Sequence, residues 1–286
     1  MTIAKTLDLV RAAREGGYAV PAVNIVDDHS IRAVVDAAES VGSPVILQTS
    51  VKTVKLIGAE QLAFAAHAAA RNVSVPVSLH LDHCPDRAVI TECIRHGWDS
   101  VLFDASDRPL ETAWAETTEV VAEAHAAGVA VESEIENIIG VEDGVGSDEA
   151  VHAYTVDQLI EVAEDTGVDT LAPQLGTAHG LYTASPELRV DRAAELVSKT
   201  EVPIVLHGGT GLTEADFHAF IDAGVAKINI STALKLAYMK GAQAHLAECE
   251  RTGKWEPVKL FAAIAEDVAK VLTEHAEIFR SAGRAA

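Results

Sequence analysis

The stretch V-S-L-H-L-D-H-C-P-D at residues 77–86 combines a predicted strand with a cluster of reactive side chains. Apolar residues at positions 75, 77, 79 and 81 alternate with smaller or more polar ones, which is the period of a strand. Asp82 and His83 then stand directly before the turn that Pro85 predicts. The pattern indicates a buried strand that ends in an acid and an imidazole.

Seven further apolar runs repeat this layout, and a helical pattern follows each of them. The predicted strands cover residues 18–24, 44–49, 75–82, 100–104, 129–136, 170–175, 202–207 and 226–230. Continuous apolar strands that alternate with helices are typical of a parallel sheet covered on both faces. Eight such units favour a (β/α)8 TIM barrel, and no G-x-G-x-x-G motif follows the first strand to indicate a dinucleotide-binding fold.

The chain length fits one barrel with an extension. A barrel of this type needs about 250 residues, and the chain has 286. We therefore expect a single domain over residues 1–286, with extra C-terminal helices over about 232–286 that break near 253–257. Residues 138–153 combine glycines and acids without a periodic pattern, which predicts a long loop.

Charge and composition exclude several classes of function. A net charge of −21 argues against binding to nucleic acid or to anionic membranes, because both reward lysine and arginine. Three cysteines are an odd number spread through a long chain, which fits a reducing compartment better than a disulfide framework. The first residues lack the apolar core of a signal peptide, and no apolar run approaches about 18 residues. We expect a cytoplasmic protein.

Each predicted strand contributes a polar residue at or near its carboxyl end. In a barrel of this kind, the carboxyl ends of the strands carry the active site. The eight ends supply Asn24, Ser50, Asp82 with His83, Asp104, Glu134, His179 just past its strand, His207 and Asn229. We therefore expect these side chains to meet around one mouth.

Three of these residues are histidines, namely His83, His179 and His207. Three imidazoles around an open fourth position suit a catalytic zinc ion, which polarises a carbonyl or an alkoxide. A lone histidine is more often a hydrogen-bonded structural residue, so the argument for a metal rests on their convergence. His80 precedes His83 by three residues and would point to the opposite face of a regular strand, which excludes it from the predicted metal site.

Carboxylates add a second signal. Glu132, Glu134 and Glu136 share one face of a strand, and they would repel one another unless a cation or solvent intervened. If the strand has ended by Glu136, one or two of them lie in water, and Glu134 is the expected site residue. Asp104 either joins the site or caps the loop that follows it.

Glycine-rich segments indicate a phosphate site. They are G-T-A-H-G at residues 176–180, H-G-G-T-G at 207–211, and the nearby K-I-N-I-S-T at 227–232. Glycine permits close backbone approach, and a helix that starts near Thr213 offers free N–H groups to an anion. Phosphate sites after the seventh and eighth strands are frequent in such barrels.

These motifs resemble those of the class II, zinc-dependent ketose-bisphosphate aldolases, the family of fructose- and tagatose-bisphosphate aldolases. The similarity runs from P-A-V-N at residues 21–24 to S-A-G-R-A at 281–285, and it includes H-L-D-H-C, the E-x-E strand with G-V-E-D-G, G-T-A-H-G-L-Y and V-L-H-G-G-T-G. It implies a lyase of carbohydrate metabolism that reversibly cleaves a ketose phosphate, such as tagatose or fructose 1,6-bisphosphate. The products are dihydroxyacetone phosphate and an aldehyde, which is glyceraldehyde 3-phosphate for a bisphosphate.

The resemblance also implies a role for each matching residue. The expected ligands of zinc and of a second divalent ion are His83, His179, His207, Glu134 and Asp104. Asp82 is expected to protonate the aldehyde oxygen as the new bond forms, and Glu142 to move the proton at the nucleophilic carbon. A monovalent cation is a further candidate near the phosphate. The expected substrate-binding residues are Asn24, Ser50, Gly180, Gly208, Gly209, Thr210, Asn229, Ser231, Thr232 and Lys235.

Departures from the family pattern bear on the substrate. Ser231 stands where fructose-bisphosphate enzymes usually carry Asp, and tagatose-bisphosphate relatives tend to have a small residue there. Lys235 occupies the position of a basic residue that binds the distal phosphate in the tagatose group. The loop sequence E-I-E-N-I-I-G at residues 134–140 is poorer in glycine than is common. Together these differences favour a ketose bisphosphate of non-fructose type.

Other functions compete with this interpretation. They are an aldolase for another ketose phosphate or a phosphorylated sugar acid, a barrel metallohydrolase, and a metal-binding scaffold without activity. Metallohydrolases usually carry a His-x-His pair on the first strand, which here ends in Asn24. Departures near Glu136 and Ala233 are the only support for the scaffold.

The C-terminal helices carry more apolar surface than the end of a barrel requires. The apolar residues are Trp255, Leu260, Phe261 and Phe279. They indicate a homodimer or homotetramer, and packing of these helices back onto the barrel is the alternative.

Overall fold

The computed structural model describes residues 3–138, 140–142, 145–147, 152–180 and 186–285, with the backbone alone at 141, 142 and 145–147. The strands are β1 Val20–Asn24, β2 Val45–Ser50, β3 Val77–Cys84, β4 Ser100–Asp104, β5 Ala130–Glu134, β6 Gly140–Glu142, β7 Val145–Ser147, β8 Thr170–Leu171, β9 Val205–Leu206 and β10 Lys227–Ile230. The helices are α1 Thr6–Gly16, α2 Asp28–Val41, α3 Val51–Ile57, α4 Ala59–Ala70, α5 Arg87–Arg95, α6 Leu110–Ala126, α7 Val156–Thr166, α8 Val190–Lys199, α9 Glu214–Asp222, α10 Thr232–Thr252 and α11 Pro257–Ile278.

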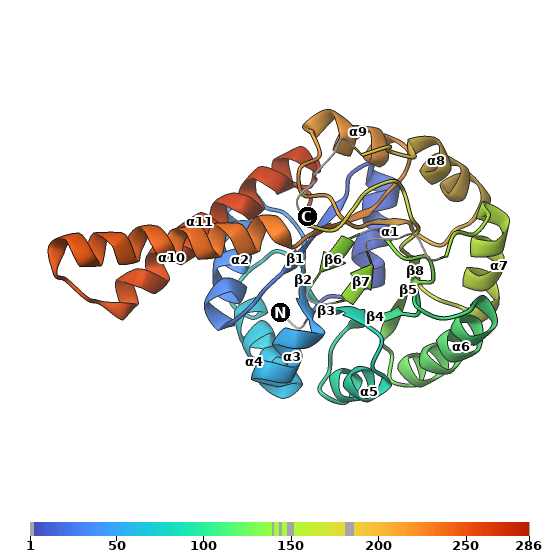
Figure 1. Cartoon of the computed structure of the whole chain (residues 1–286), viewed down its shortest axis with the longest axis horizontal. Helices are drawn as coiled ribbons and strands as arrows, with labels where there is room; N and C mark the ends of the chain where they lie inside the picture. The colour runs from blue at the N-terminus through green and yellow to red at the C-terminus, as the bar shows by residue number, and fades with distance from the viewer. Residues whose placement is uncertain (1–2, 139, 143–144, 148–151, 181–185, 286) are drawn as a thin grey trace.

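Eight parallel strands form a nearly closed barrel surrounded by helices (Figure 1), which confirms the predicted (β/α)8 fold. The strand order is β8-β5-β4-β3-β2-β1-β10-β9, so the first strand of the chain pairs with the last. The ring closes between β8 and β9 through a bridge between Leu171 and Ile204 and a 3.0 Å hydrogen bond from the Leu171 N–H to the Pro203 carbonyl. Closure brings all the carboxyl strand ends to one mouth.

Three local features differ from the sequence prediction. The segment 138–153, expected to be a long loop, contains the antiparallel hairpin of β6 and β7. A separate helix, α3, follows β2 directly, because the Ser50 side chain accepts a hydrogen bond from the Thr53 N–H and so caps its start. The predicted strands at 170–175 and 202–207 shorten to the two-residue strands β8 and β9.

Side-chain caps determine where several outer helices begin. Asp27 accepts a 2.7 Å hydrogen bond from the Ser30 N–H at the start of α2. Thr155 with Gln158 starts α7, and the pair Thr213 and Asp216 starts α9, each as a reciprocal capping box. These caps satisfy N–H groups that the helices would otherwise leave free.

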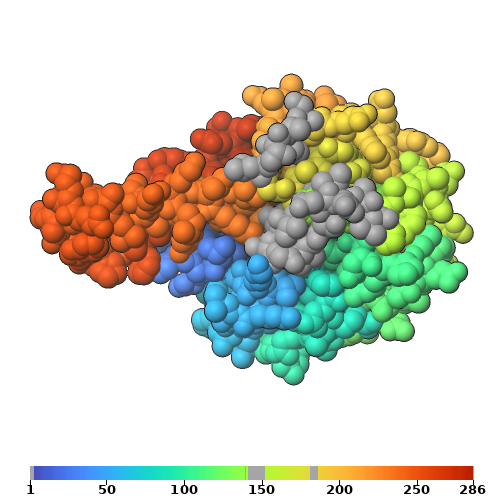
Figure 2. Space-filling model, in the orientation of Figure 1, coloured from blue at the N-terminus to red at the C-terminus, as the bar shows by residue number. Residues whose placement is uncertain are grey.

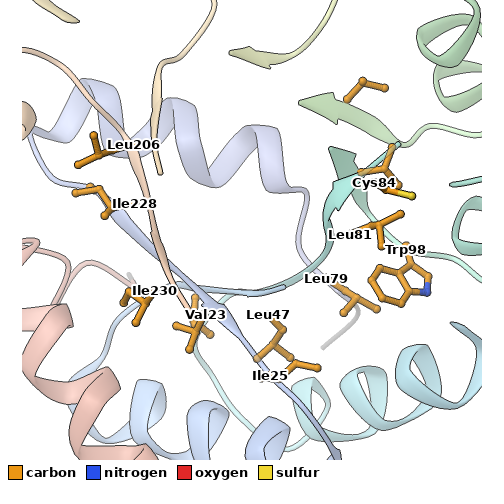
Figure 3. Close-up of a cluster of buried hydrophobic side chains, with 14 of the residues drawn as sticks. Val23, Ile25, Leu47, Leu79, Leu81, Cys84, Trp98, Leu206, Ile228 and Ile230 are labelled. Atoms are coloured by element: carbon orange, nitrogen blue, oxygen red, sulfur yellow. The ribbon is translucent and has the colours of Figure 1, made fainter. Parts of the chain in front are cut away.

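An apolar layer between the strands and the helices holds the barrel together. Figure 3 shows part of this layer, with Val23, Leu47, Leu79 and Ile228 on neighbouring strands, each fully buried. Toward their carboxyl ends the strands present apolar residues outward and polar residues inward, because successive side chains alternate between the two faces. The interior is therefore available for polar side chains.

Helix α1 fills the amino end of the barrel. Its residues Leu9, Val10 and Ala13 pack in one buried cluster with Val20 and other strand residues. The Thr6 hydroxyl lies 2.7 Å from the hydroxyl of Ser100, the first residue of β4. This end is occupied by the chain itself, which leaves the carboxyl end for a site.

Helices α10 and α11 form a hairpin that projects from the barrel (Figures 1 and 2). The base of the hairpin packs onto the barrel, where Phe279 is fully buried against Phe217 at a ring-centroid distance of 5.0 Å. At the tip of the hairpin Trp255 is 63% exposed, and Met239, in the first half of α10, is 65% exposed. Part of the predicted apolar surface thus packs back, and part faces outward. Among the helices in the described residues, none has both the length and the hydropathy needed to cross a bilayer.

Candidate active site

A bulge at the end of β3 turns two consecutive side chains into the barrel. The pairing of β3 with β4 shifts register between Leu81 and Cys84, and His83 has a φ of 43°, in the left-handed region. The Asp82 carboxylate meets Asn24, while His83 meets Asp104. Adjacent residues of a regular strand face opposite sides, so Asp82 and His83 can both face the mouth only where the backbone departs from β geometry. The bulge provides this departure.

His80 is also inside the barrel, which corrects the prediction that it faces the opposite side from His83. Its Nδ1 lies 2.8 Å from the Ser100 hydroxyl, and its Nε2 lies 3.9 Å from a carboxylate oxygen of Glu132. The alternation places His80 and Asp82 on the same face, and the bulge then brings His83 to that face as well. Burial lowers the pKa of His80 to about 3, so this ring is neutral and lies below the histidine cluster.

Three histidines meet at the mouth, as predicted. The rings of His83 and His207 lie 4.7 Å apart, those of His83 and His179 lie 4.8 Å apart, and those of His179 and His207 lie 6.2 Å apart. One ring nitrogen from each lies within 4.8 Å of the others. Barrel closure thus joins residues that stand far apart in the sequence.

The unpaired atoms of this cluster fit a divalent metal. His83 Nε2, both nitrogens of His179, His207 Nδ1 and Glu134 Oε2 are buried and make no hydrogen bond within the described part of the chain. Buried polar atoms without a partner are costly, and a shared cation would satisfy Glu134 Oε2 and one nitrogen of each histidine. Three imidazole nitrogens with nearby carboxylate oxygens are a donor set typical of zinc.

Asp104 and Glu134 form a second potential metal group with His83. His83 Nδ1 lies 3.1 Å from Asp104 Oδ2 and 3.7 Å from Glu134 Oε2. Asp104 also accepts hydrogen bonds from the backbone N–H and the hydroxyl of Ser106. Asp104 thus fills both of the roles considered for it: it lies in the cluster with His83, and it caps the loop that follows it.

All three glutamates of the E-x-E-x-E segment are buried, so the idea that one or two lie in water was wrong. Each has a cationic or imidazole partner. Glu132 lies 2.9 Å from the Nζ of Lys227, Glu134 lies 3.0 Å from His207 Nδ1, and Glu136 lies 2.9 Å from a guanidinium nitrogen of Arg192. Glu132 and Lys227 were not predicted as site residues from the sequence. Lys227 stands two residues before Asn229 in a strand, and this spacing could have placed it inside the barrel.

The Asp82 carboxylate is held by two amides and is ionised. Asn24 donates to one oxygen at 2.8 Å, and Asn229 donates to the other at 3.2 Å. Burial raises the pKa of Asp82, but the charges of His83, His207 and Lys227 outweigh it and lower the pKa to about 2. Gln48, which the sequence prediction also missed, orients Asn24 through a 2.6 Å hydrogen bond.

A hollow beside the histidines joins most of the predicted phosphate residues. It is lined by His179, Gly180, His207, Gly208, Gly209, Thr210, Asn229, Ser231 and Thr232. Gly208 has a φ of 69°, and a Cβ there would lie 2.5 Å from the Ala178 carbonyl oxygen, so this turn requires glycine. The hollow reaches the first residue of α10, whose N-terminus favours an anion, whereas Thr213 is outside its lining.

The remaining predicted residues lie around this centre. Asn24 contacts Asp82, and Ser50 is buried at the end of β2 beside Asp82 in the strand register. Lys235 lies on the first turn of α10, where its N–H donates to the Ser231 carbonyl. The backbone of Glu142 belongs to β6, and its side chain lies outside the described residues.

The amino-acid sequence matches the family model of fructose-bisphosphate aldolase class-II over residues 4–284. The chain belongs to the class II fructose-bisphosphate aldolase family. It is therefore an aldolase, and the resemblance inferred from the motifs is confirmed. Aldolases of this class are generally metal-dependent and act on phosphorylated sugars, in agreement with the histidine cluster and the glycine-lined hollow.

Solved structures of aldolases share the architecture. The YdjI aldolase of Escherichia coli K12 is 29% identical, with a TM-score of 0.87 and full coverage of both chains. A candidate fructose-1,6-bisphosphate aldolase of Coccidioides immitis is 30% identical, with a TM-score of 0.89 and 98% coverage of each chain. Fructose-bisphosphate aldolase of Campylobacter jejuni is 24% identical, with a TM-score of 0.84 over 99% of this chain and 97% of that one. The last comparison shows that the class II aldolase fold is shared.

Proposed function

We propose that this aldolase reversibly cleaves a ketose phosphate, of the tagatose- or fructose-1,6-bisphosphate type, into dihydroxyacetone phosphate and an aldehyde. One observation carries the proposal. Three buried histidines with unpaired nitrogens stand between an ionised aspartate and a glycine-lined hollow. This arrangement offers a metal site, a proton acceptor and a phosphate site within one mouth.

The metal in this proposal is zinc, held by His83, His179 and His207. Their unpaired nitrogens support the assignment, and Glu134 with Asp104 would hold a second divalent ion beside them. When bound, the cation supplies a Lewis acid for the oxygens that become negative in the enediolate.

Asp82 acts as the proton-transfer group at the aldehyde side. In cleavage, its ionised carboxylate takes the proton of the hydroxyl on the carbon that becomes the aldehyde, and that C–O bond becomes a carbonyl. The electron pair of the broken C–C bond passes to the dihydroxyacetone half. Glu142 then delivers a proton to the nucleophilic carbon, which completes dihydroxyacetone phosphate. In condensation both transfers run backward, so Asp82 protonates the aldehyde oxygen. The amides of Asn24 and Asn229 orient the carboxylate throughout.

The phosphate of the dihydroxyacetone half is assigned to the hollow. Gly180, Gly208, Gly209, Thr210 and Thr232 would bind it through backbone N–H and hydroxyl groups, near a monovalent cation. Asn24 and Asn229 would contact the sugar oxygens, Ser50 and Lys235 would lie toward the distal phosphate, and the small Ser231 favours the tagatose configuration.

A cleavage panel tests this proposal. Zinc-loaded protein is mixed with fructose, tagatose and other ketose 1-phosphates and 1,6-bisphosphates, and with a phosphorylated sugar acid, while a coupled reduction detects dihydroxyacetone phosphate. We expect release from at least one member, with tagatose 1,6-bisphosphate preferred over its fructose epimer. Release from none of them under saturating substrate would refute the proposed reaction.

We further propose that the aldolase is a cytoplasmic homo-oligomer that buries the tip of the α10–α11 hairpin against a second copy. Trp255, Met239 and Val258 are 63%, 65% and 70% exposed along this projection. Such apolar exposure on one projection marks an interaction surface. The three free, buried cysteines agree with a reducing compartment.

Light scattering tests the assembly. The wild-type chain is expected at twice or four times the monomer mass, and Trp255→Glu with Val258→Glu is expected to lower that mass, because the charges oppose burial. Leu56→Glu is the matched control, since Leu56 is 85% exposed away from the hairpin. A wild-type monomer at assay concentration would contradict the proposal.

A further inference from the structure

Lys227 is a fully buried lysine inside the barrel, and its ammonium contacts two site residues. Its Nζ lies 2.9 Å from Glu132 Oε2, and it donates a 2.8 Å hydrogen bond to Asn229 Oδ1. A buried ammonium is costly unless it is paired and fully hydrogen-bonded. The ion pair with Glu132 meets that requirement and keeps Glu132 a carboxylate.

Glu132 in turn contacts one nitrogen of His207. Glu132 Oε1 lies 2.9 Å from His207 Nε2 and accepts a 3.2 Å hydrogen bond from Lys227. Glu132 Oε2 lies 2.9 Å from the same ammonium and accepts a hydrogen bond from the hydroxyl of Thr170. An ionised carboxylate accepts hydrogen bonds and cannot donate them. The short contact therefore places a proton on Nε2 of His207.

The other ring nitrogen of His207 faces the histidine cluster. His207 Nδ1 and Glu134 Oε2 lie 3.0 Å apart, but both atoms are buried without a hydrogen bond in the described residues. Unlike the hydrogen-bonded contact of Nε2 with Glu132, this contact therefore does not hold a proton on the nitrogen. With the proton held on Nε2, the lone pair is on Nδ1. The nitrogen that is free to bind a cation is thus the one that points at His83 and His179.

We propose that Glu132, held by Lys227, is a positioning residue that selects the His207 tautomer and so makes Nδ1 the metal-binding nitrogen. The inference rests on the proposed metal role of His207. It adds a function for a buried ion pair that itself touches neither metal nor substrate. Among the described residues, the carboxylate nearest to His83 Nε2 is that of Asp82, at 4.0 Å, and this nitrogen makes no hydrogen bond. His83 therefore offers Nε2 to the same cluster.

The substitution Glu132→Gln tests this role because it keeps the shape and removes the obligate acceptor. The amide oxygen is expected to turn to the Lys227 ammonium, which leaves the amide NH2 facing His207 Nε2. The His207 ring then accepts a hydrogen bond from this amide at Nε2, and its proton moves to Nδ1. A protonated Nδ1 has no lone pair with which to bind the metal. We expect a 10- to 100-fold loss of zinc affinity, measured by competition with a chromophoric chelator.

Nitrogen NMR of histidine-labelled, zinc-loaded protein gives a readout independent of activity. In the wild type, His207 is expected to show a protonated Nε2 and a coordinated Nδ1, with the signal assigned by loss in His207→Gln. Glu136→Gln is the control, because Glu136 is equally buried and is paired with Arg192 but touches none of the cluster histidines. It is expected to leave the His207 signals and the zinc affinity unchanged.

The outcomes separate this inference from the proposed function. Zinc bound by the wild type through Nε2 of His207 overturns the tautomer assignment but leaves the aldolase proposal intact. Unchanged zinc affinity and ring signals in Glu132→Gln overturn the role of Glu132, and absence of zinc binding overturns both proposals. If Glu132→Gln fails to fold, as thermal unfolding would reveal, the wild-type ring assignment alone decides.

Discussion

Removal of divalent metal is expected to reduce cleavage by at least about a thousandfold, since Lewis-acid stabilisation is worth several kcal/mol. The buried cluster supports this magnitude. His83 Nε2, His207 Nδ1 and both nitrogens of His179 have no hydrogen-bond partner in the described chain. The measurement is the cleavage rate after dialysis against EDTA, with the metal content determined by mass spectrometry.

Zinc added back in stoichiometric amount is expected to restore the rate. Magnesium is the control, because it prefers oxygen ligands and binds poorly to imidazole. Thermal unfolding before and after dialysis shows whether the chain stays folded. Full activity in a preparation with no detectable metal would contradict the proposed chemistry.

Replacement of Asp82 by asparagine is expected to lower kcat by about a hundredfold to ten-thousandfold, the usual range for a lost general acid or base. Asparagine keeps the shape but cannot take up the hydroxyl proton. The carboxylate of Asp82 accepts from Asn24 and Asn229 and is 4.0 Å from His83 Nε2, so the substitution is expected to leave zinc bound. Steady-state kinetics and metal analysis of the same preparation measure both effects.

A second reaction distinguishes loss of Asp82 from general damage. Exchange of the carbon-bound proton of dihydroxyacetone phosphate with solvent needs the dihydroxyacetone half of the site but no aldehyde. Asp82→Asn is therefore expected to keep this exchange, while Asp36→Asn, an exposed surface change, keeps both reactions. Turnover equal to wild type in Asp82→Asn would remove Asp82 from the mechanism.

The strand ends could be predicted from sequence because barrel topology needs only the order of the elements. Eight apolar runs placed His83, His179 and His207 at one mouth, although each is far from the others in the chain. The bulge at His83 was also predictable, since two adjacent residues cannot both face the interior of a regular strand. Topology thus supplied most of the site.

The buried network below the mouth was harder to predict. Its members contact one another across strands, as Glu132 does with Lys227, and neither residue reveals its partner by spacing. His80 was assigned to the wrong face, because the strand was counted as regular through the bulge. The hairpin of β6 and β7 lacks an apolar period, so its sequence resembles a loop.

The closure of the barrel between β8 and β9 has a thermodynamic consequence. This seam is joined by the bridge between Leu171 and Ile204 and by one backbone hydrogen bond to Pro203, while β8 and β9 have two residues each. His179 and His207 follow the two strands of the seam, one on each side. A cation held by both histidines would link the two sides of this seam. Because it would bind the closed form more tightly than the open one, it would stabilise the closed barrel. Local opening of the seam and release of the cation are then linked equilibria, so a bound cation would make opening less frequent.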